Sequence, residues 1–194
     1  IFCGSMTLAS AAYYAPYLQD FCGMPTNIAV TFTSYRGIVC QLIGASLAAV
    51  LATKMKNSSK PMIGAGIVGI VCFVGMILIP ASAAVLWPVM IITIVASMAV
   101  YVFRALYYAT VDESGTPKNM VGSVIGIASL FGFLPDTFYT SLCGSWLEAD
   151  PVGGYKNIFT AACCAMALGL VCAFLAERLI RKHRASNSNA ISAE

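Results

Sequence analysis

Charged residues are scarce in this chain of 194 residues: only 10% are Asp, Glu, Lys or Arg, whereas 59% are hydrophobic. A soluble domain usually contains about 25% charged residues. So few charges cannot cover the surface of a water-soluble domain of this length, and the mean hydropathy is +0.83. The sequence therefore excludes an ordinary soluble fold and predicts a protein whose solvent is largely lipid.

Several motifs that carry chemistry are also missing. The chain has one histidine, His183, none of its eight cysteines forms a CxxC pair, and there is no phosphate-binding P-loop. We therefore expect no metal site, no cofactor, no nucleic-acid partner and no nucleotide-driven pump. Paired carboxylates within one apolar span are missing as well. The sequence thus argues against an integral-membrane enzyme.

A signal peptide is not recognisable at the start of the chain. Ile1 leads directly into an apolar run, without a basic n-region or a small-residue cleavage site. We expect the sequence to be a fragment of a longer membrane protein, cut just before or within its first helix.

Six apolar runs are each close to the roughly 20 residues that a helix needs to cross the hydrocarbon core. They are Phe2–Leu18, Ile28–Ala52, Met62–Ile79, Ala84–Tyr108, Val121–Leu147 and Ile158–Leu175. The loops between them are short, so we expect neighbouring helices to be antiparallel. The predicted fold class is an all-α integral membrane protein with six transmembrane helices.

Most positive charges outside the spans fall on one side of the predicted bundle, and Lys156 is the exception on the other side. The others occur after the second, fourth and sixth spans: Lys54, Lys56, Lys60, Lys118, Arg178, Arg181, Lys182 and Arg184. Because cytoplasmic loops carry an excess of Lys and Arg, we expect both ends of the chain to be cytoplasmic. The transmembrane bundle is predicted to cover residues 1–184, and residues 185–194 to form a disordered cytoplasmic tail.

One arginine is predicted deep inside a span. Arg36 lies about eight residues from the outer end of its helix, or roughly 12 Å, which is near the bilayer midplane. An arginine there costs at least about 2.5 kcal/mol, so it needs a partner or a water-filled cavity. One interpretation is a clamp for an anionic substrate, with Thr33, Gln41 and Tyr14 as further substrate-binding residues. The alternative is an arginine neutralised by a carboxylate or by helix carbonyl groups, and the alternative for Tyr14 is a place in the interfacial aromatic belt.

Four further charged residues are candidates for coupling or gating. Arg104 lies about one turn from the cytoplasmic end of its span, where it can snorkel, pair with Asp112 or Glu113, or act with them as a gate. Asp136 follows Pro135 inside the fifth span, where the proline predicts a bent helix. This carboxylate can bind a proton or Na⁺, or it can pair with Arg36.

Small residues mark the expected packing faces. Gly122 and Gly126 form a GxxxG pair, and Gly44 and Ala48 have the same spacing in the second span. Such positions allow two helix backbones to approach closely.

Two segments together resemble a known family. Gly44 and the residues from Ala48 to Lys54 are similar to a degenerate GxLADR-type loop motif, with Ala48 in place of Gly and Thr53 in place of Asp. The second segment contains Arg104, Tyr107, Tyr108, Glu113, Pro117, Gly122, Gly126, Ser129, Gly132, Pro135 and Asp136. The arrangement resembles the C-terminal half of a major facilitator superfamily transporter, helices seven to twelve of twelve, near the bacterial carriers of sugar phosphates and other organic anions.

The resemblance implies a half-bundle built from two inverted three-helix repeats. It also implies a secondary transporter in the bacterial inner membrane that moves a small solute by alternating access. Its partners would be the lipid bilayer, a small-molecule substrate, a coupling H⁺ or Na⁺, and an N-terminal six-helix half that this sequence lacks. The alternative function is a non-transporting receptor or assembly subunit with the same fold.

Overall fold

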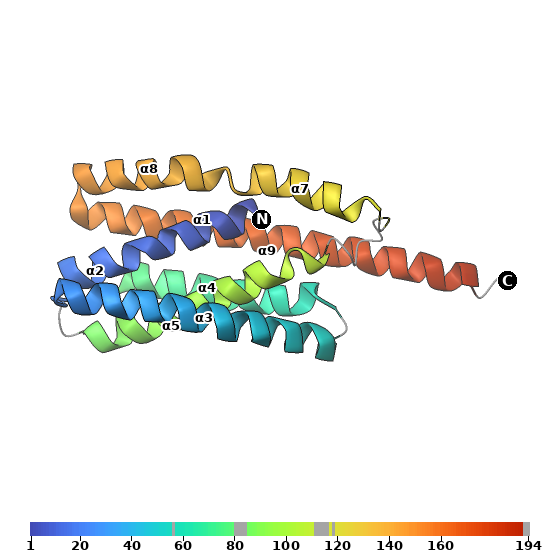
Figure 1. The fold of residues 1–194 in the computed structure, drawn as a ribbon, viewed down its shortest axis with the longest axis horizontal. Helices are drawn as coiled ribbons and strands as arrows, with labels where there is room; N and C mark the ends of the chain where they lie inside the picture. Colours follow the sequence, from blue (N-terminus) through green and yellow to red (C-terminus); the bar gives the residue numbers. More distant parts are fainter. Residues whose placement is uncertain (56, 80–84, 111–116, 118, 192–194) are drawn as a thin grey trace.

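The computed structural model describes residues 1–55, 57–79, 85–110, 117 and 119–191, with side chains described as far as Lys182. Its described elements are α1 (Phe2–Ser10), η1 (Ala11–Tyr13), α2 (Tyr14–Asp20), α3 (Thr26–Met55), α4 (Ser59–Leu78), α5 (Leu86–Leu106), α7 (Val121–Gly132), α8 (Pro135–Ala149) and α9 (Pro151–Ile191). Every regular element in these residues is helical, as predicted. The helices run roughly side by side as an elongated bundle (Figure 1).

Five described helical segments are long and apolar enough to cross a membrane: α3, α4, α5, the α7–α8 pair and the first part of α9. They match the second to sixth predicted spans. The first predicted span is helical as well, but η1 divides it into α1 and α2. Pro16 explains this division, because its ring crowds the carbonyl group four residues earlier, at Ala12 within η1.

The fifth span is divided at Phe133 and Leu134, between α7 and α8. Pro135 lies at the first turn of α8, where its missing N–H group costs nothing. Pro135 also cannot donate a hydrogen bond to the carbonyl group of Phe131, four residues earlier, and its ring crowds that group, so the regular helical ladder is interrupted after Gly132. The bend that Pro135 predicts is therefore confirmed.

The core of the bundle forms around α4, which packs against both α5 and α9. Two glycines of α4 allow the close approach to α9: a Cβ atom on Gly66 would lie 2.7 Å from Leu170 Cδ1, and one on Gly69 would lie 2.9 Å from Met166 Cε. Helix α3 packs on α5, and α1 packs on α8 and α9. Small residues thus set the helix spacing, as expected for packing within a membrane.

Of the two predicted small-residue packing faces, one makes a close helix contact in the described structure and the other does not. A Cβ atom on Gly44 would lie 2.9 Å from Tyr101 Cβ, so Gly44 lets α3 approach α5. In contrast, a Cβ atom on Gly122 or Gly126 would meet no described atom within 4 Å. The GxxxG pair of α7 therefore makes no close helix contact within the described residues.

The end of the chain differs from the disordered tail that we expected from residue 185 onward. Helix α9 continues to Ile191, and residues 192–194 lie outside the described residues. Gly169 is the last Gly or Pro in the sequence. No helix-breaking residue is therefore present to end α9 near residue 185.

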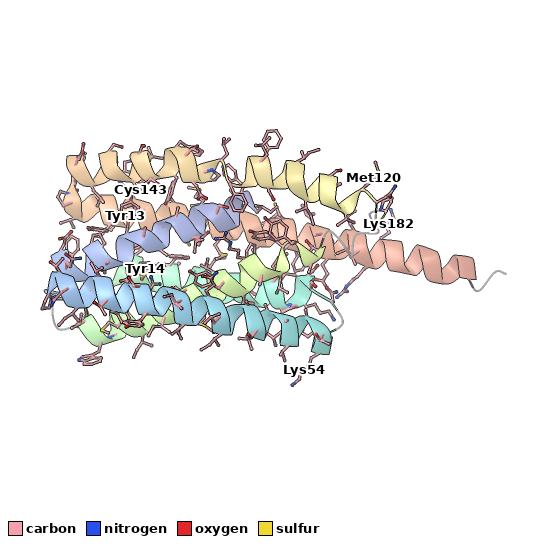
Figure 2. All side chains as sticks on the ribbon, in the orientation of Figure 1. Tyr13, Tyr14, Lys54, Met120, Cys143 and Lys182 are labelled. Atoms are coloured by element: carbon pink, nitrogen blue, oxygen red, sulfur yellow. The ribbon has the colours of Figure 1, made fainter. Side chains whose placement is uncertain are left out.

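The two ends of the bundle differ in chemistry. Lys54 and Lys182 lie toward the same end (Figure 2). Near the other end, Tyr155 donates a hydrogen bond of 2.7 Å to Asp20 Oδ2, and its ring meets Tyr17 edge-on at 5.4 Å. The placement of the lysines agrees with the predicted charge asymmetry.

Candidate functional site

Arg36 lies in the interior, as its sequence position predicted, with only 7% of its surface exposed. Its Nη1 atom donates hydrogen bonds to Ser97 Oγ and, at 3.4 Å, to the carbonyl oxygen of Thr93, both on α5. Its guanidinium carbon lies 4.6 Å from the ring centroid of Tyr14 on α2. One side chain of α3 therefore contacts both α5 and α2.

The surroundings of Arg36 also contain unsatisfied polar atoms. Arg36 Nε, Tyr14 Oη and Thr33 Oγ1 are buried without a hydrogen-bond partner among the described residues. A buried polar atom without a partner costs about 1–3 kcal/mol. Water or a ligand that entered this region would find a donor on Arg36 and two hydroxyl groups within the same part of the bundle.

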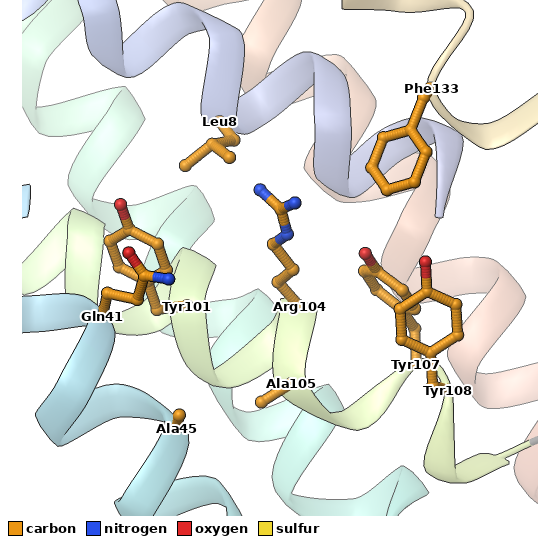
Figure 3. A pocket seen from close by; sticks show the side chains of 9 residues that line it. All are labelled: Leu8, Gln41, Ala45, Tyr101, Arg104, Ala105, Tyr107, Tyr108 and Phe133. Carbon is orange, nitrogen blue, oxygen red and sulfur yellow. The ribbon is translucent and has the colours of Figure 1, made fainter. Parts of the chain in front are cut away.

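A second arginine borders a cavity of about 340 Å³. The cavity is lined by Leu8, Gln41, Ala45, Tyr101, Arg104, Ala105, Tyr107, Tyr108 and Phe133. In Figure 3 the guanidinium of Arg104 points away from its own helix, into the space between Leu8 and Phe133. Its carbon lies 5.7 Å from the Phe133 ring centroid. The cavity thus combines one cationic group with several aromatic rings.

Four parts of the fold supply the walls of this cavity. Leu8 comes from α1, Gln41 and Ala45 from α3, the residues from Tyr101 to Tyr108 from α5 and the turn that follows it, and Phe133 from the α7–α8 junction. The close approach at Gly44 brings the α3 and α5 walls together. The bend at Pro135 places Phe133 at a helix end, where it reaches the cavity.

Tyrosine hydroxyls and rings are held in defined positions around Arg104. Tyr108 Oη lies 3.1 Å from Ser129 Oγ on α7, and the rings of Tyr107 and Tyr108 meet edge-on at 4.4 Å. A Cβ atom on Gly37 would lie 4.0 Å from Tyr101 Oη, so the Tyr101 hydroxyl lies beside the helical turn that carries Arg36. Tyr101 therefore connects the cavity to the surroundings of Arg36.

The predicted substrate-binding residues fall into two groups. Tyr14 contacts Arg36, and Thr33 lies one turn before it on α3, where its hydroxyl is buried. Gln41 lies instead on the cavity that Arg104 borders. The structure therefore places two of the three polar residues beside Arg36 and the third with Arg104.

The predicted pairing of Arg36 with Asp136 is not present among the described residues. Asp136 is exposed in the first turn of α8, whereas Arg36 contacts α5 and α2. The described ion pairs contain only Arg181 with Glu177, at 2.7 Å. Asp112 and Glu113, the expected partners of Arg104, lie outside the described residues.

Sequence reasoning did not single out Ser97, Tyr101 or Phe133. Ser97 and Tyr101 lie one turn apart on α5, and Arg104 follows Tyr101 by three residues. Polar residues at helical spacing in an otherwise apolar span are the signal that predicts a polar face. For Phe133 the only signal is its position two residues before Pro135.

Comparison with known proteins finds distant similarity to bacterial inner membrane proteins. No protein-family profile matches the chain, and no solved structure matches it. Two curated proteins of Escherichia coli (strain K12) are similar: Inner membrane protein YqcE, 26% identical over 180 residues, and Inner membrane protein YihN, 23% identical over 187 residues. These alignments cover 89% and 95% of this chain but 41% and 43% of the two relatives.

The chain therefore spans less than half the length of the curated relatives it matches. Together with the five long apolar helical segments of the described structure, the similarity defines an all-helical integral membrane protein, a distant homologue of bacterial inner membrane proteins.

Proposed function

We propose that this chain is the C-terminal six-helix half of a secondary transporter that moves a small organic anion by alternating access. The observation that carries the proposal is the positive interior. Arg36 is buried and Arg104 borders a cavity, and neither forms an ion pair with a carboxylate among the described residues. A ligand anion is the natural complement to such an interior.

On energetic grounds, Arg36 supports an anionic ligand more strongly than Arg104 does. A buried arginine on a membrane helix is costly, and such residues usually mark a ligand pathway or a structural partner. Its neutral contacts with Ser97, Thr93 and Tyr14 reduce this cost but leave its positive charge uncompensated. Among the described residues, the charge of Arg36 therefore favours an anionic ligand over a cationic one in this part of the bundle.

Sparse burial supports the proposal of a missing half. Only 17% of the most apolar window of α3 and 11% of that of the α7–α8 pair are buried, compared with 44% for α4 and for α5. The relatives are more than twice as long as the aligned region. We propose that an N-terminal half covers these faces, and that α1–α4 and α5–α9 form two inverted three-helix repeats of the major facilitator superfamily.

The proposed cycle involves no chemical conversion of the solute. Asp136 is the candidate coupling residue for H⁺ or Na⁺, because it is a carboxylate beside a helix break within an apolar span. Arg104, with Asp112 and Glu113, is the candidate gate at the basic end. We place that end in the cytoplasm, with the chain in a bacterial inner membrane.

One observation favours the alternative of a non-transporting receptor or assembly subunit. The contacts of Arg36 with α5 and α2 give that residue a structural role without any substrate. Counterflow separates the two functions: the full-length protein is reconstituted in proteoliposomes preloaded with an unlabelled organic anion, and uptake of the labelled anion is followed. Transient accumulation is expected of a transporter. Binding of an anion without counterflow in either membrane orientation would support the receptor.

A further inference from the structure

We propose that the cavity between α1, α3, α5 and the α7–α8 junction is the substrate-anion site, and that Arg104, not Arg36, makes the direct contact with the anion. This inference rests on the proposed function and assigns its site. It also gives the substrate a chemical class: a small organic oxyanion with hydrogen-bonding substituents on its body.

Arg104 is more accessible to a solute than Arg36 is. Arg104 borders a cavity of about 340 Å³, at the small end of the usual range of ligand pockets. In Figure 3 its guanidinium extends into that space. Arg36 is absent from the lining of this cavity and is 7% exposed. A solute therefore reaches Arg104 without rearrangement of the bundle, whereas contact with Arg36 requires displacement of its present neighbours.

The two arginines also differ in the groups that they contact. The Nη1 atom of Arg36 donates to Ser97 and to the Thr93 carbonyl, and its guanidinium plane lies near the Tyr14 ring. Such contacts fix the side chain between three helices. Arg104 extends into its cavity, where its described contacts are with residues of the cavity lining: the ring of Phe133, at 5.7 Å, and Tyr107. Its guanidinium keeps the planar fork that binds a carboxylate, sulfonate or phosphate group in a bidentate manner.

The remaining lining of the cavity suits the uncharged part of an organic anion. Tyr101, Tyr107, Tyr108 and Gln41 place hydroxyl and amide groups around the cavity, and the described lining contains no acidic side chain. These groups are suited to neutral hydrogen-bonding substituents on the ligand. The rings of Phe133 and the tyrosines provide apolar faces for its carbon skeleton. A bare inorganic ion would leave most of this lining unused.

The walls of the cavity come from several different spans of the bundle. The first and second spans supply Leu8 and Gln41, whereas the fourth and fifth spans supply Arg104 and Phe133. Movement of these segments relative to one another changes the shape of the cavity. A site built in this way senses the conformational state of the bundle, as alternating access requires.

The test measures anion binding to the purified full-length protein in detergent. The probes are sodium salts of small hydroxycarboxylates, sulfonates and phosphate monoesters, with inorganic phosphate as the bare ion and sodium chloride as the ionic-strength control. Thermal stabilisation selects the strongest probe, and titration gives its Kd. The variants are Arg104→Ala, Arg104→Lys and Arg36→Ala, with Arg178→Ala as the matched control on exposed α9 surface.

We expect an organic oxyanion to bind the unchanged protein more tightly than inorganic phosphate. Arg104→Ala should raise the Kd about tenfold or more, because a charge-assisted contact is lost. Arg104→Lys should show a smaller loss, and Arg178→Ala should show none. If Arg104→Ala fails to fold, Tyr101→Phe and Gln41→Leu still test the cavity, and each should weaken binding without changing the elution profile.

The contrary results separate the two proposals. If anions bind Arg104→Ala as tightly as the unchanged protein but no longer bind Arg36→Ala, the site assignment is overturned and the anion-transport proposal stands. If no anion in the set binds the unchanged protein, while a neutral or cationic solute does, the proposed function itself fails. Equal weakening by Arg178→Ala would show a general charge effect and would also overturn the assignment.

Discussion

Arg36 has more contacts between helices than its place in an apolar span suggests. Its two hydrogen bonds reach α5, and its guanidinium lies against Tyr14 of α2. Each contact is with a neutral group, so the positive charge is held by dipoles and an aromatic face. This side chain therefore holds α3 in register with its two neighbours.

Replacing Arg36 should reveal this role as a loss of stability. We expect Arg36→Ala to lower the free energy of unfolding by about 2–4 kcal/mol, because hydrogen bonds to a charged group and a desolvated cation–π contact disappear together. Unfolding of the protein in detergent, followed by circular dichroism, measures the change. Arg178→Ala is the control and should stay within about 0.5 kcal/mol of the unchanged protein. Equal stability of the two variants would remove the structural role of Arg36.

Asp136 provides a second test at the residue scale. It is exposed on α8, and the described ion pairs do not join it to Arg36. The stability changes of Arg36→Ala and Asp136→Ala should therefore add in the double variant to within about 0.5 kcal/mol. Recovery of stability in the double variant by more than about 1 kcal/mol would show that the two charges interact after all.

Individual residues also indicate how much of the site could be predicted from the sequence. The depth of Arg36 follows from counting along its span, and its burial is confirmed. Its partners Thr93 and Ser97 lie 57 and 61 residues away in the chain. No local sequence pattern predicts which face of α5 packs against α3. The cavity at Arg104 depends on the same tertiary information, so the sequence singled out individual members, such as Arg104 and Gln41, but did not group them in one cavity.

At the scale of elements, glycine and proline decide how the helices meet. Pro16 and Pro135 each lie beside a change in helical geometry, and the bend at Pro135 was predictable because proline acts locally. The glycine contacts were less predictable. Gly44 approaches Tyr101 closely, whereas Gly122 and Gly126 meet no described atom, although all three stand in similar small-residue patterns. The pattern identifies candidates, and the packing partner decides which of them is used.

The contact at Gly44 gives a prediction about the α3–α5 interface. Gly44→Ala would place a Cβ atom 2.9 Å from Tyr101 Cβ, so the helices must move apart. We expect a loss of about 1–3 kcal/mol in the free energy of unfolding, the usual cost of overpacking. Gly64→Ala on α4 is the matched control, because a Cβ atom there meets no described atom within 4 Å. That control should be neutral or gain up to about 1 kcal/mol from helix propensity.

A result in which both glycine variants behave alike would contradict the packing of α3 on α5. The shape of the Arg104 cavity provides a second readout, because Gln41 and Tyr101 face it from these two helices. Gly44→Ala should therefore weaken anion binding as well as stability, and Gly64→Ala should change neither for the worse.

At the scale of the whole molecule, the distribution of charge predicts orientation. Lys54 and Lys182 lie toward one end of the bundle, and Met120 lies toward the same end (Figure 2). Met120 precedes the α7–α8 pair and is 56% exposed. Val152 follows this pair, at the start of α9, and is 52% exposed. From the positive-inside rule we propose that the lysine end faces the cytoplasm.

Labelling of introduced cysteines in sealed cells tests this orientation. A membrane-impermeant thiol reagent should modify Val152→Cys from outside and should spare Met120→Cys until the cells are opened. The unchanged protein reports any background from its native cysteines, which include the eight of this sequence. Labelling of Met120→Cys in sealed cells, with Val152→Cys protected, would invert the topology.

The central claim is that the positive interior of this bundle serves the passage of an anion. Its most direct test is uptake into proteoliposomes that contain the full-length protein, comparing an organic carboxylate with its neutral amide, which has almost the same shape. The account predicts that the carboxylate enters, that the amide does not, and that Arg104→Ala abolishes uptake while Arg178→Ala preserves it. Equal uptake of the amide and the carboxylate, unaffected by Arg104→Ala, would contradict the account.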